Sequence, residues 1–221
     1  MTVILINLLQ REFTMIKPIF ITATLLASSL AFSAQNYVVD PQLTDYRGNQ
    51  GKSDVWISHE DSDGGLGDVG SSGDTAFDAQ GSSRIRFKEK VAINDFTAKP
   101  GLSQVITGLP ANTDMTFSLY YCDKKGPASP STLYYGVREA VEGASLTGKV
   151  IAENRVHTRD LDAAPKGEKK ACFRQVNVDF NSGAGAVEIF SLMEVYVGDA
   201  DKPDMTKDIE VRIDEFSVTA K

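Results

Sequence analysis

The segment Thr107 to Lys125, TGLPANTDMTFSLYYCDKK, constrains the fold more than any other part of the chain. It opens on a turn signal, Gly-Leu-Pro followed by Asn-Thr-Asp. The next residues alternate in character: Met115, Phe117, Leu119 and Tyr121 share one phase, and mostly smaller or polar residues fill the other. Period-two alternation rich in aromatic residues is typical of a half-buried strand. The segment therefore predicts a strand with one face in a core and the other turned outward.

Segments of the same kind recur along the chain, separated by turns rich in Gly, Pro, Asn and Ser. They predict further strands over 35–43, 54–59, 84–87, 102–107, 132–139, 149–156, 172–180, 187–197 and 209–218. No stretch has convincing helical periodicity, although 137–146 could form one helical turn. The pattern predicts an all-β protein, a two-sheet antiparallel β-sandwich of jelly-roll type, formed by a single domain over 34–221.

The stretch 60–83, EDSDGGLGDVGSSGDTAFDAQGSS, is too rich in Gly, Ser and Asp to bury much surface. It predicts a long surface loop. Its acidic part, 61–68, loosely resembles oxygen-rich calcium loops but lacks the spacing and terminal glutamate of an EF-hand. A calcium loop and a solvated loop both remain open here.

The first 33 residues predict a leader rather than part of the fold. Met15 is the expected start, with Lys17 as the positive region, 19–30 as the apolar region and Ala31-Phe32-Ser33 as a small-x-small cleavage site. The alternative is an N-terminal membrane anchor, although the apolar run is shorter than the roughly 20 residues of a comfortable span. We expect a signal peptide over 1–33, and a bacterial protein that is secreted or periplasmic with no membrane segment after cleavage.

The net charge limits the expected binding partners, and the cysteine content indicates the cellular compartment. The formal net charge of −7 argues against nucleic acid and against anionic membranes. The two cysteines, Cys122 and Cys172, predict a disulfide in an exported protein. Their strand phases conflict, since Cys122 lies in the non-core phase and Cys172 in the apolar phase of 172–180, so a bulge near one strand end is needed. We expect a monomer.

Five segments, in order, resemble the β-sandwich modules of carbohydrate-binding families 4, 9, 16 and 22. VVDPQL resembles the "NPGFE" first strand, GSSRIRF resembles "GSxSLRV", and TGLPANTDMTFSLYY is similar to "GLxPNTxYTLSxY". FRQVNVDFNSG resembles "WTRVSVTFTAG", and VRIDEFSV is similar to "VYIDDVSL". The segments YYGVREA and CFRQVNVDFNSG are most similar to modules that accompany bacterial alginate lyases. The resemblance implies polysaccharide binding, with an acidic marine glycan such as alginate as the expected ligand.

The resemblance also implies a structural calcium that joins the first strand to the last. Carried over to this chain, Asp214 is the expected ligand and Asp40 the second candidate. The chain departs from the family pattern at Thr44, where relatives have the glutamate of "FE", and at Glu215, the second acid of "IDD". Backbone carbonyls would then have to complete the six to eight oxygen ligands that calcium prefers. The alternative is that Asp214 is a solvated acid at a strand bulge.

Sugar binding requires aromatic rings against the apolar face of a pyranose and planar polar side chains for its hydroxyls. The non-core phases of three predicted strands supply such a set: Tyr120, Tyr134, Arg138, Gln175 and Asn177. If these strands share one sheet, the set lines its exposed face, and Arg138 would bind a uronate carboxylate in a bidentate manner. Trp56 is a further candidate platform, with a place in the core as the alternative. For the tyrosines the alternative is ordinary cross-strand packing.

An enzyme is less well supported by the sequence than a binding protein. The jelly-roll alginate lyase motifs "RxExR", "QIH" and "YxKAGxYxQ" do not match SSRIRF, SQVITG and LYYGVRE. His59 and His157 lie in polar segments expected to be exposed, and no nucleophile elbow, metal-ligand histidine pair or phosphate loop is present. We expect a non-catalytic polysaccharide-binding protein. A polysaccharide lyase or other carbohydrate-active enzyme, and a structural or matrix protein of the same fold without a sugar site, are the alternatives.

Overall fold

The computed structural model describes residues 34–61, 66–73, 75–78, 81–88, 96–157, 160, 172–196 and 204–221. Residues Ala34–Lys221 form one compact unit. The predicted leader, 1–33, and half of the acidic stretch 61–68 lie outside the described residues. No helix of the described residues is long and apolar enough to cross a membrane.

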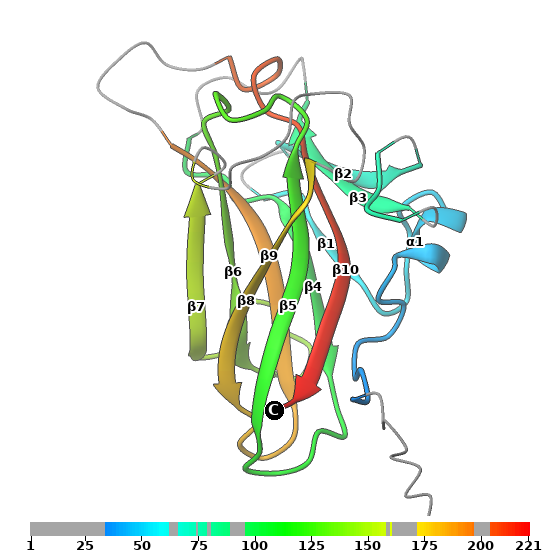
Figure 1. Ribbon diagram of the computed structural model, residues 1–221, viewed down its shortest axis with the longest axis vertical. Coiled ribbons are helices and arrows are strands. Elements are labelled where there is room, and N and C mark those ends of the chain that lie inside the picture. Colours follow the sequence, from blue (N-terminus) through cyan, green and yellow to red (C-terminus); the bar gives the residue numbers. More distant parts are fainter. Residues whose placement is uncertain are drawn as a thin grey trace, which may run out of the picture. The chain divides into compact units, whose positions relative to one another are not determined.

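The described residues form ten strands in two five-stranded sheets, and one short helix, as Figure 1 shows. The first sheet has the order β1-β4-β9-β6-β7 and contains β1 (Ile57–His59), β4 (Gly101–Ile106), β9 (Val187–Val195), β6 (Ser131–Glu139) and β7 (Val150–His157). The second has the order β2-β3-β10-β5-β8 and contains β2 (Gly67–Ser72), β3 (Ser82–Phe87), β10 (Val211–Ala220), β5 (Asp114–Asp123) and β8 (Arg174–Asn181). All pairings within them are antiparallel. The predicted two-sheet β-sandwich is confirmed.

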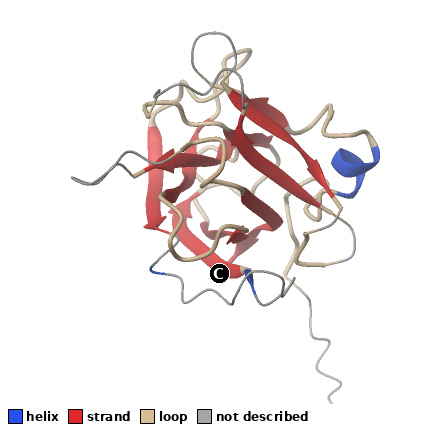
Figure 2. Cartoon of the chain, turned by 90° about the horizontal axis from the view of Figure 1, so that it is seen from above, coloured by secondary structure: helices blue, strands red, loops and turns tan. Residues whose placement is uncertain are grey.

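The predicted alternation of β5 is confirmed residue by residue. Met115, Phe117, Leu119 and Tyr121 are fully buried and belong to one hydrophobic core between the sheets. The end-on view in Figure 2 shows the two sheets wrapped around this interior. Because side chains alternate across a strand, one correct phase fixes which residues of β5 face outward.

Three predictions about the N-terminal half are wrong. Residues 35–43 form no strand, although Tyr37 N donates a hydrogen bond to Val218 O at 3.0 Å and Phe216 N donates one to Pro41 O at 2.8 Å. The expected turn after it contains a five-residue helix, α1 (Thr44–Gly48). The expected surface loop contains β2, which pairs with β3 at six positions. Glycine and serine give a weak strand signal, but backbone hydrogen bonding does not need large side chains.

The predicted disulfide between Cys122 and Cys172 is present, with Cα atoms 5.4 Å apart. The expected phase conflict does not arise, because β8 begins at Arg174 and Cys172 precedes the strand. Both cysteines pack with Phe173 in a small hydrophobic cluster that is separate from the main core. The bridge therefore anchors the start of β8 to the outer side of β5.

We expect loss of the disulfide to destabilise the fold by about 2–4 kcal/mol, because it closes a long loop in the unfolded chain. The two cysteines are 50 residues apart in sequence. Urea unfolding of the wild type with and without reductant measures this directly. The double variant Cys122→Ala with Cys172→Ala serves as the control and should show no effect of reductant. Equal unfolding midpoints for the oxidised and reduced wild type would contradict the prediction.

A buried acid lies beside this disulfide, at the end of β5. Asp123 is 1% exposed, and its carboxylate accepts hydrogen bonds from the hydroxyls of Ser129 and Ser131 and from Lys125 N. Burial raises the pKa of Asp123 from 3.8 to about 6, although these hydrogen bonds oppose the rise. The native state therefore holds this proton to a higher pH than the unfolded chain does.

The raised pKa predicts that this group stabilises the fold less as the pH increases from about 4 to 6. Two pKa units correspond to about 3 kcal/mol at most. We expect the free energy of unfolding of the wild type to fall by up to that amount between pH 4 and pH 7, relative to Asp123→Asn. Urea titrations of both proteins across this range measure the difference. Parallel pH curves for the two proteins would show that Asp123 does not titrate in this window.

Candidate functional site

The predicted sugar-binding residues lie on two opposite faces of the sandwich. Strand β6 pairs with β7 and β9, whereas β5 pairs with β8 and β10. The condition that these strands share one sheet is therefore not met. We call the outer surface of the β1-β4-β9-β6-β7 sheet the β6 face and that of the other sheet the β5 face. The β6 face carries Tyr134 and Arg138, and the β5 face carries Tyr120, Gln175 and Asn177.

Trp56 belongs to neither face. Its side chain is 3% exposed and packs in the main core, where its ring centroid lies 4.5 Å from that of Phe216. Its indole Nε1 donates a hydrogen bond to Asp40 O at 3.1 Å. Since no face of the ring reaches solvent, Trp56 cannot serve as a sugar platform in this structure, and the core interpretation is the one observed.

The β6 face has an aromatic and aliphatic floor. Tyr134, Phe190 and Leu192 form a hydrophobic cluster apart from the main core, with Leu146 packed against it. Gly101 and Gly136 lie beside them on the neighbouring strands. A Cβ at Gly136 would come within 3.0 Å of the Phe190 ring, and one at Gly101 within 3.0 Å of Leu192 Cδ2. The two glycines therefore let the floor side chains lie flat against the sheet.

Two cations cover the ring of Tyr134. The guanidinium of Arg155 lies 3.9 Å from the ring centroid and the ammonium of Lys99 lies 5.2 Å from it. Glu194 holds both, at 2.7 Å from Lys99 Nζ and 3.0 Å from Arg155 Nε, and Glu153 lies 3.1 Å from Arg155 Nη1. Both cationic side chains are more than two-fifths exposed, so these ion pairs are weak and exchangeable.

The phenol of Tyr134 is part of this arrangement. Its hydroxyl donates a hydrogen bond to Glu153 and accepts one from Arg138 Nη2 at 3.2 Å. Burial raises the pKa of Tyr134, and the bond to Glu153 adds to the rise. The same bond is the main cause that lowers the pKa of the Glu153 carboxyl. The site is therefore a neutral phenol flanked by charged groups of both signs.

The side chain of Arg138 binds the backbone of a loop and does not lie open on the β6 face. Its Nη1 donates hydrogen bonds to Leu146 O at 3.1 Å and to Gly148 O at 3.3 Å, and its guanidinium lies 4.9 Å from the Phe190 ring centroid. Glu188, which is 1% exposed, accepts hydrogen bonds from Leu146 N at 2.8 Å and from the Ser145 hydroxyl. The loop 140–149, which joins β6 to β7, is thus tied to the floor by both residues. Arg138 is less available to a uronate than the sequence suggests.

His59 lies at the end of this network and is half-buried rather than exposed. Its Nε2 lies 2.8 Å from Ser103 Oγ, and burial lowers the pKa of His59 while the charge of Glu188 opposes that shift. A histidine beside a serine has the composition of a nucleophilic pair. Ser103, however, has no exposed surface, and the Ser145 hydroxyl donates to Glu188 instead. This network therefore has the features of a structural tie for the loop.

We expect Arg138→Ala to loosen the loop 140–149, because two backbone carbonyls lose their donor. Amide hydrogen exchange in this loop should become about 5- to 30-fold faster, as expected for a local loss of about 1–2 kcal/mol. Lys149→Ala is the matched control, since it removes a cation from an exposed position at the end of the same loop. Unchanged exchange in Arg138→Ala would show that the loop is held by other contacts.

The two expected calcium ligands both accept hydrogen bonds from the protein backbone. The Asp40 carboxylate accepts hydrogen bonds from the backbone nitrogens of Asp45 and Tyr46, at the start of α1. Asp214 is 1% exposed and accepts hydrogen bonds from Phe77 N at 2.9 Å and Glu215 N at 2.8 Å. Burial raises the pKa of Asp214 to about 7. Within the described part of the chain no three acidic, histidine or cysteine side chains form a group that could hold a metal, and calcium stays a prediction.

The β5 face brings together the other three predicted residues. Tyr120 lies opposite Gln175 in the β5–β8 pairing, and Asn177 lies one row further along, opposite Ser118. Gln175 and Asn177 are exposed and Tyr120 is half-buried. Of the five residues expected on one face, these three share the β5 face, and their role in sugar binding stays a prediction.

Sequence reasoning missed Arg155, Lys99 and Phe190 on the β6 face. Arg155 was within reach of a sequence argument, because it lies in the polar phase of a predicted strand. Phe190 belongs to an almost continuously apolar stretch, whose two faces the sequence does not distinguish. Lys99 precedes β4 and comes near Tyr134 only through the order of strands in the sheet.

No protein-family model matches the chain, and no curated protein matches it in sequence. Its fold recurs in solved structures. The N-terminal CBM22-1-CBM22-2 tandem domain from Paenibacillus barcinonensis Xyn10C aligns with a TM-score of 0.52 and 12% identity, over 88% of this chain and 51% of that one. The enzymatically active domain of bacteriophage CBA120 tailspike protein 4 aligns with a TM-score of 0.50 and 12% identity, over 84% of this chain and 21% of that one.

The chain therefore spans about half of the first of these structures and about a fifth of the second. At 12% identity the likeness concerns the fold alone. The association with alginate lyases has no counterpart in these two structures. What the comparisons establish is that this chain has a β-sandwich fold found in carbohydrate-binding modules of the CBM22 type.

Proposed function

We propose that this protein is a non-catalytic polysaccharide-binding protein whose β6 face contacts the glycan. The observation that carries the proposal is the ring of Tyr134, which is part of the apolar floor, is 5% exposed and is covered by Arg155 and Lys99. Aromatic rings beside polar groups are the usual components of a sugar site. The fold shared with the CBM22 tandem domain and the sequence resemblance to carbohydrate-binding modules support the same function.

The charges around Tyr134 favour an acidic glycan such as alginate. Arg155 and Lys99 form ion pairs with the carboxylates of Glu153 and Glu194. A uronate carboxylate has the same chemistry and can take the place of either glutamate beside the cations. Moving the two long side chains aside would also open the ring of Tyr134 to the sugar. A secreted or periplasmic location would give the protein access to such a polymer, and the disulfide is compatible with it.

The proposal predicts that Arg155→Ala weakens binding to alginate about 5- to 30-fold, because one charge-assisted contact is worth about 1–2 kcal/mol. Affinity electrophoresis of the mature protein through gels with alginate, pectin, xylan, laminarin or no polymer measures the effect. Lys207→Ala is the matched control, because Lys207 is 79% exposed and pairs with Asp204 at an exposed turn. A parallel set of gels with chelator tests whether calcium contributes.

Equal mobility of the wild type in the alginate gel and the polymer-free gel would contradict binding to alginate. If Arg155→Ala and Lys207→Ala reduce the retardation equally, binding depends on net charge alone and not on Arg155. An increase in the absorbance of unsaturated products during incubation with alginate would favour the lyase alternative. Absence of both retardation and turnover with every polymer would favour a structural protein.

A further inference from the structure

The part of the β5 face formed by β8, β5 and β10 carries three rows of side chains that run across these strands. The row at one end contains Gln175, Tyr120 and Asp214, and the middle row contains Asn177, Ser118 and Ser217. The row at the other end contains Asp179, Thr116 and Thr219. Hydroxyl and amide side chains dominate, in positions where strands of a solvated face often carry charged residues.

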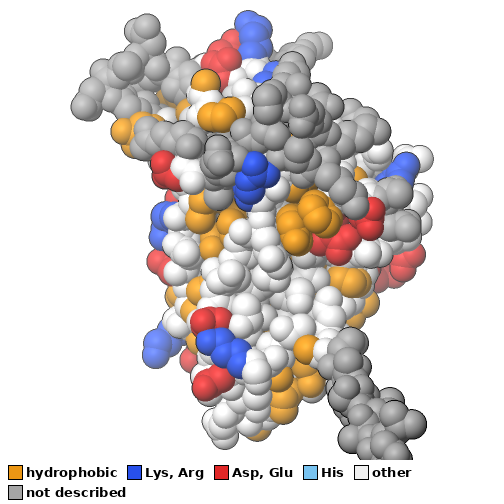
Figure 3. Space-filling view, in the orientation of Figure 1, with side chains coloured by type: hydrophobic (Ala, Val, Ile, Leu, Met, Phe, Trp, Pro, Cys, Tyr) orange, Lys and Arg blue, Asp and Glu red, His pale blue; other side chains and the backbone are white. Residues whose placement is uncertain are grey.

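The charged side chains of the two outermost rows, Asp179 and Asp214, are paired or buried. Asp179 lies 2.6 Å from Lys221 Nζ and accepts a hydrogen bond from the Thr116 hydroxyl at 2.8 Å. Asp214 is buried beneath the backbone of Phe77. Figure 3 looks onto the side where β5, β8 and β10 lie in front, and most of its middle is coloured as neither charged nor hydrophobic. The middle of the β5 face is therefore uncharged.

The amides in these rows are available for a ligand. Asn177 is exposed, and its side chain has no hydrogen-bond partner among the described residues. Gln175 is exposed and makes one long hydrogen bond, 3.4 Å from its Nε2 to Ser118 Oγ. Each amide offers two donors and an acceptor in one plane, a combination that matches sugar hydroxyls.

An aromatic cluster adjoins the amide rows. The rings of Phe77 and Tyr120 are stacked with centroids 3.9 Å apart, and Phe173 meets Phe77 edge-on at 6.0 Å. Phe77 and Tyr120 are half-buried. Such a cluster offers the apolar surface that a pyranose ring covers, beside groups that bind its hydroxyls.

We propose that the β5 face is a second carbohydrate-binding face, specific for neutral polysaccharides. The middle row provides no cation for a uronate and no anion that would repel one, and the Asp179–Lys221 ion pair lies at the edge of the rows, so recognition in the middle depends on hydroxyl groups and on the Tyr120–Phe77 cluster. The β6 face, in contrast, carries Arg155 and Lys99 around its tyrosine. One molecule would then hold a neutral glycan on one sheet and an acidic glycan on the opposite sheet.

Glycan binding by the two faces can be tested separately on the same mature protein. In gels that contain unsubstituted xylan, laminarin or hydroxyethyl cellulose, we expect retardation by at least one polymer. The double variant Gln175→Ala with Asn177→Ala should reduce that affinity at least tenfold and leave retardation by alginate unchanged. Arg155→Ala should show the reverse pattern. Asn49→Ala is the matched control, an exposed asparagine next to α1 whose loss should change neither.

Failure of this proposal is distinguishable from failure of the proposed alginate binding, because each has its own polymer and its own variant. The proposal is overturned if no neutral polymer retards the wild type. It is also overturned if the double variant binds the neutral polymer as well as the wild type does, or if only Arg155→Ala loses that binding. Far-UV circular dichroism of each variant checks that these exposed substitutions leave the fold intact.

Discussion

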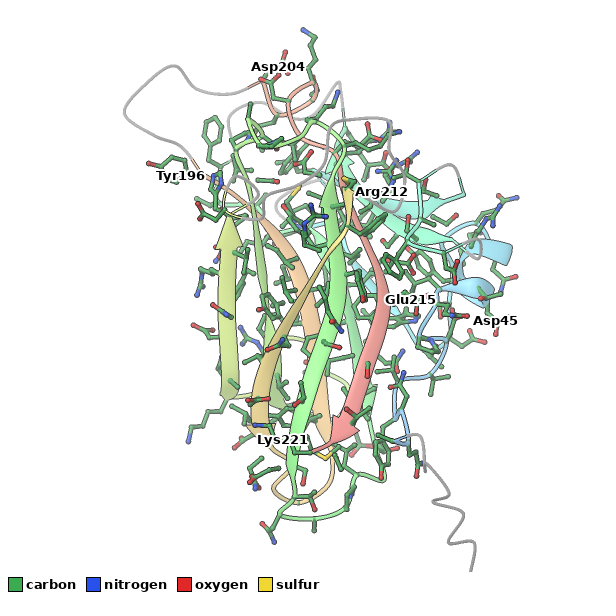
Figure 4. All side chains as sticks on the ribbon, in the orientation of Figure 1. Asp45, Tyr196, Asp204, Arg212, Glu215 and Lys221 are labelled. Atoms are coloured by element: carbon green, nitrogen blue, oxygen red, sulfur yellow. A yellow bond between two sulfur atoms is a disulfide. The ribbon has the colours of Figure 1, made fainter. Side chains whose placement is uncertain are left out.

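The pairing of β10 with β5 is the interaction on which the rest of this fold depends. The two strands pair at eight positions, and a register shift between Asp214 and Ser217 interrupts them. At this bulge Glu215 has a left-handed backbone, with φ of 50°. Figure 4 shows Glu215 on the side of β10 that faces α1. Gln42 Nε2 donates a hydrogen bond to Glu215 and Phe216 N donates one to Pro41 O, so the bulge fastens the N-terminal segment to the last strand.

The same central pair separates two chemically different surfaces. The inner phase of β5 and β10 fills the core, and the outer phase is polar on the lower part of the strands. Near the upper end of the β5–β10 pair, Arg212 and Cys122 lie opposite each other, and both side chains are buried on the outer side of the sheet. Arg212 Nη2 lies 2.6 Å from Glu210 Oε1, which compensates for burying the guanidinium. The outer side of the sheet is therefore buried at the Arg212 end, while Gln175 and Asn177 further along the sheet are exposed.

The β6 face is organised around the loop 140–149 and the cations over Tyr134. Glu188 and Arg138 of adjacent strands lie opposite each other and each binds the backbone of this loop. The loop in turn places Leu146 against the aromatic floor. Because these polar groups are satisfied within the protein, the side chains that remain exchangeable are Arg155, Lys99 and their glutamate partners. Arg155 can therefore exchange its partner for a glycan, whereas Arg138 is committed to the loop.

The sequence by itself determined the fold class, the disulfide partners and the outward phase of β5, β6 and β8. Period-two alternation is a local property, so it identifies Tyr120, Tyr134 and Asn177 as outward-facing without knowledge of the strand partners. It could not identify β2, whose glycines and serines give little strand signal, or the core position of Trp56. Only the tertiary structure decided that β5 and β6 enter opposite sheets, because hydrogen-bonded pairing joins strands that are distant in sequence. That pairing separates Tyr120 from Tyr134 and brings Lys99 to Arg155, and so determines the chemistry of each face.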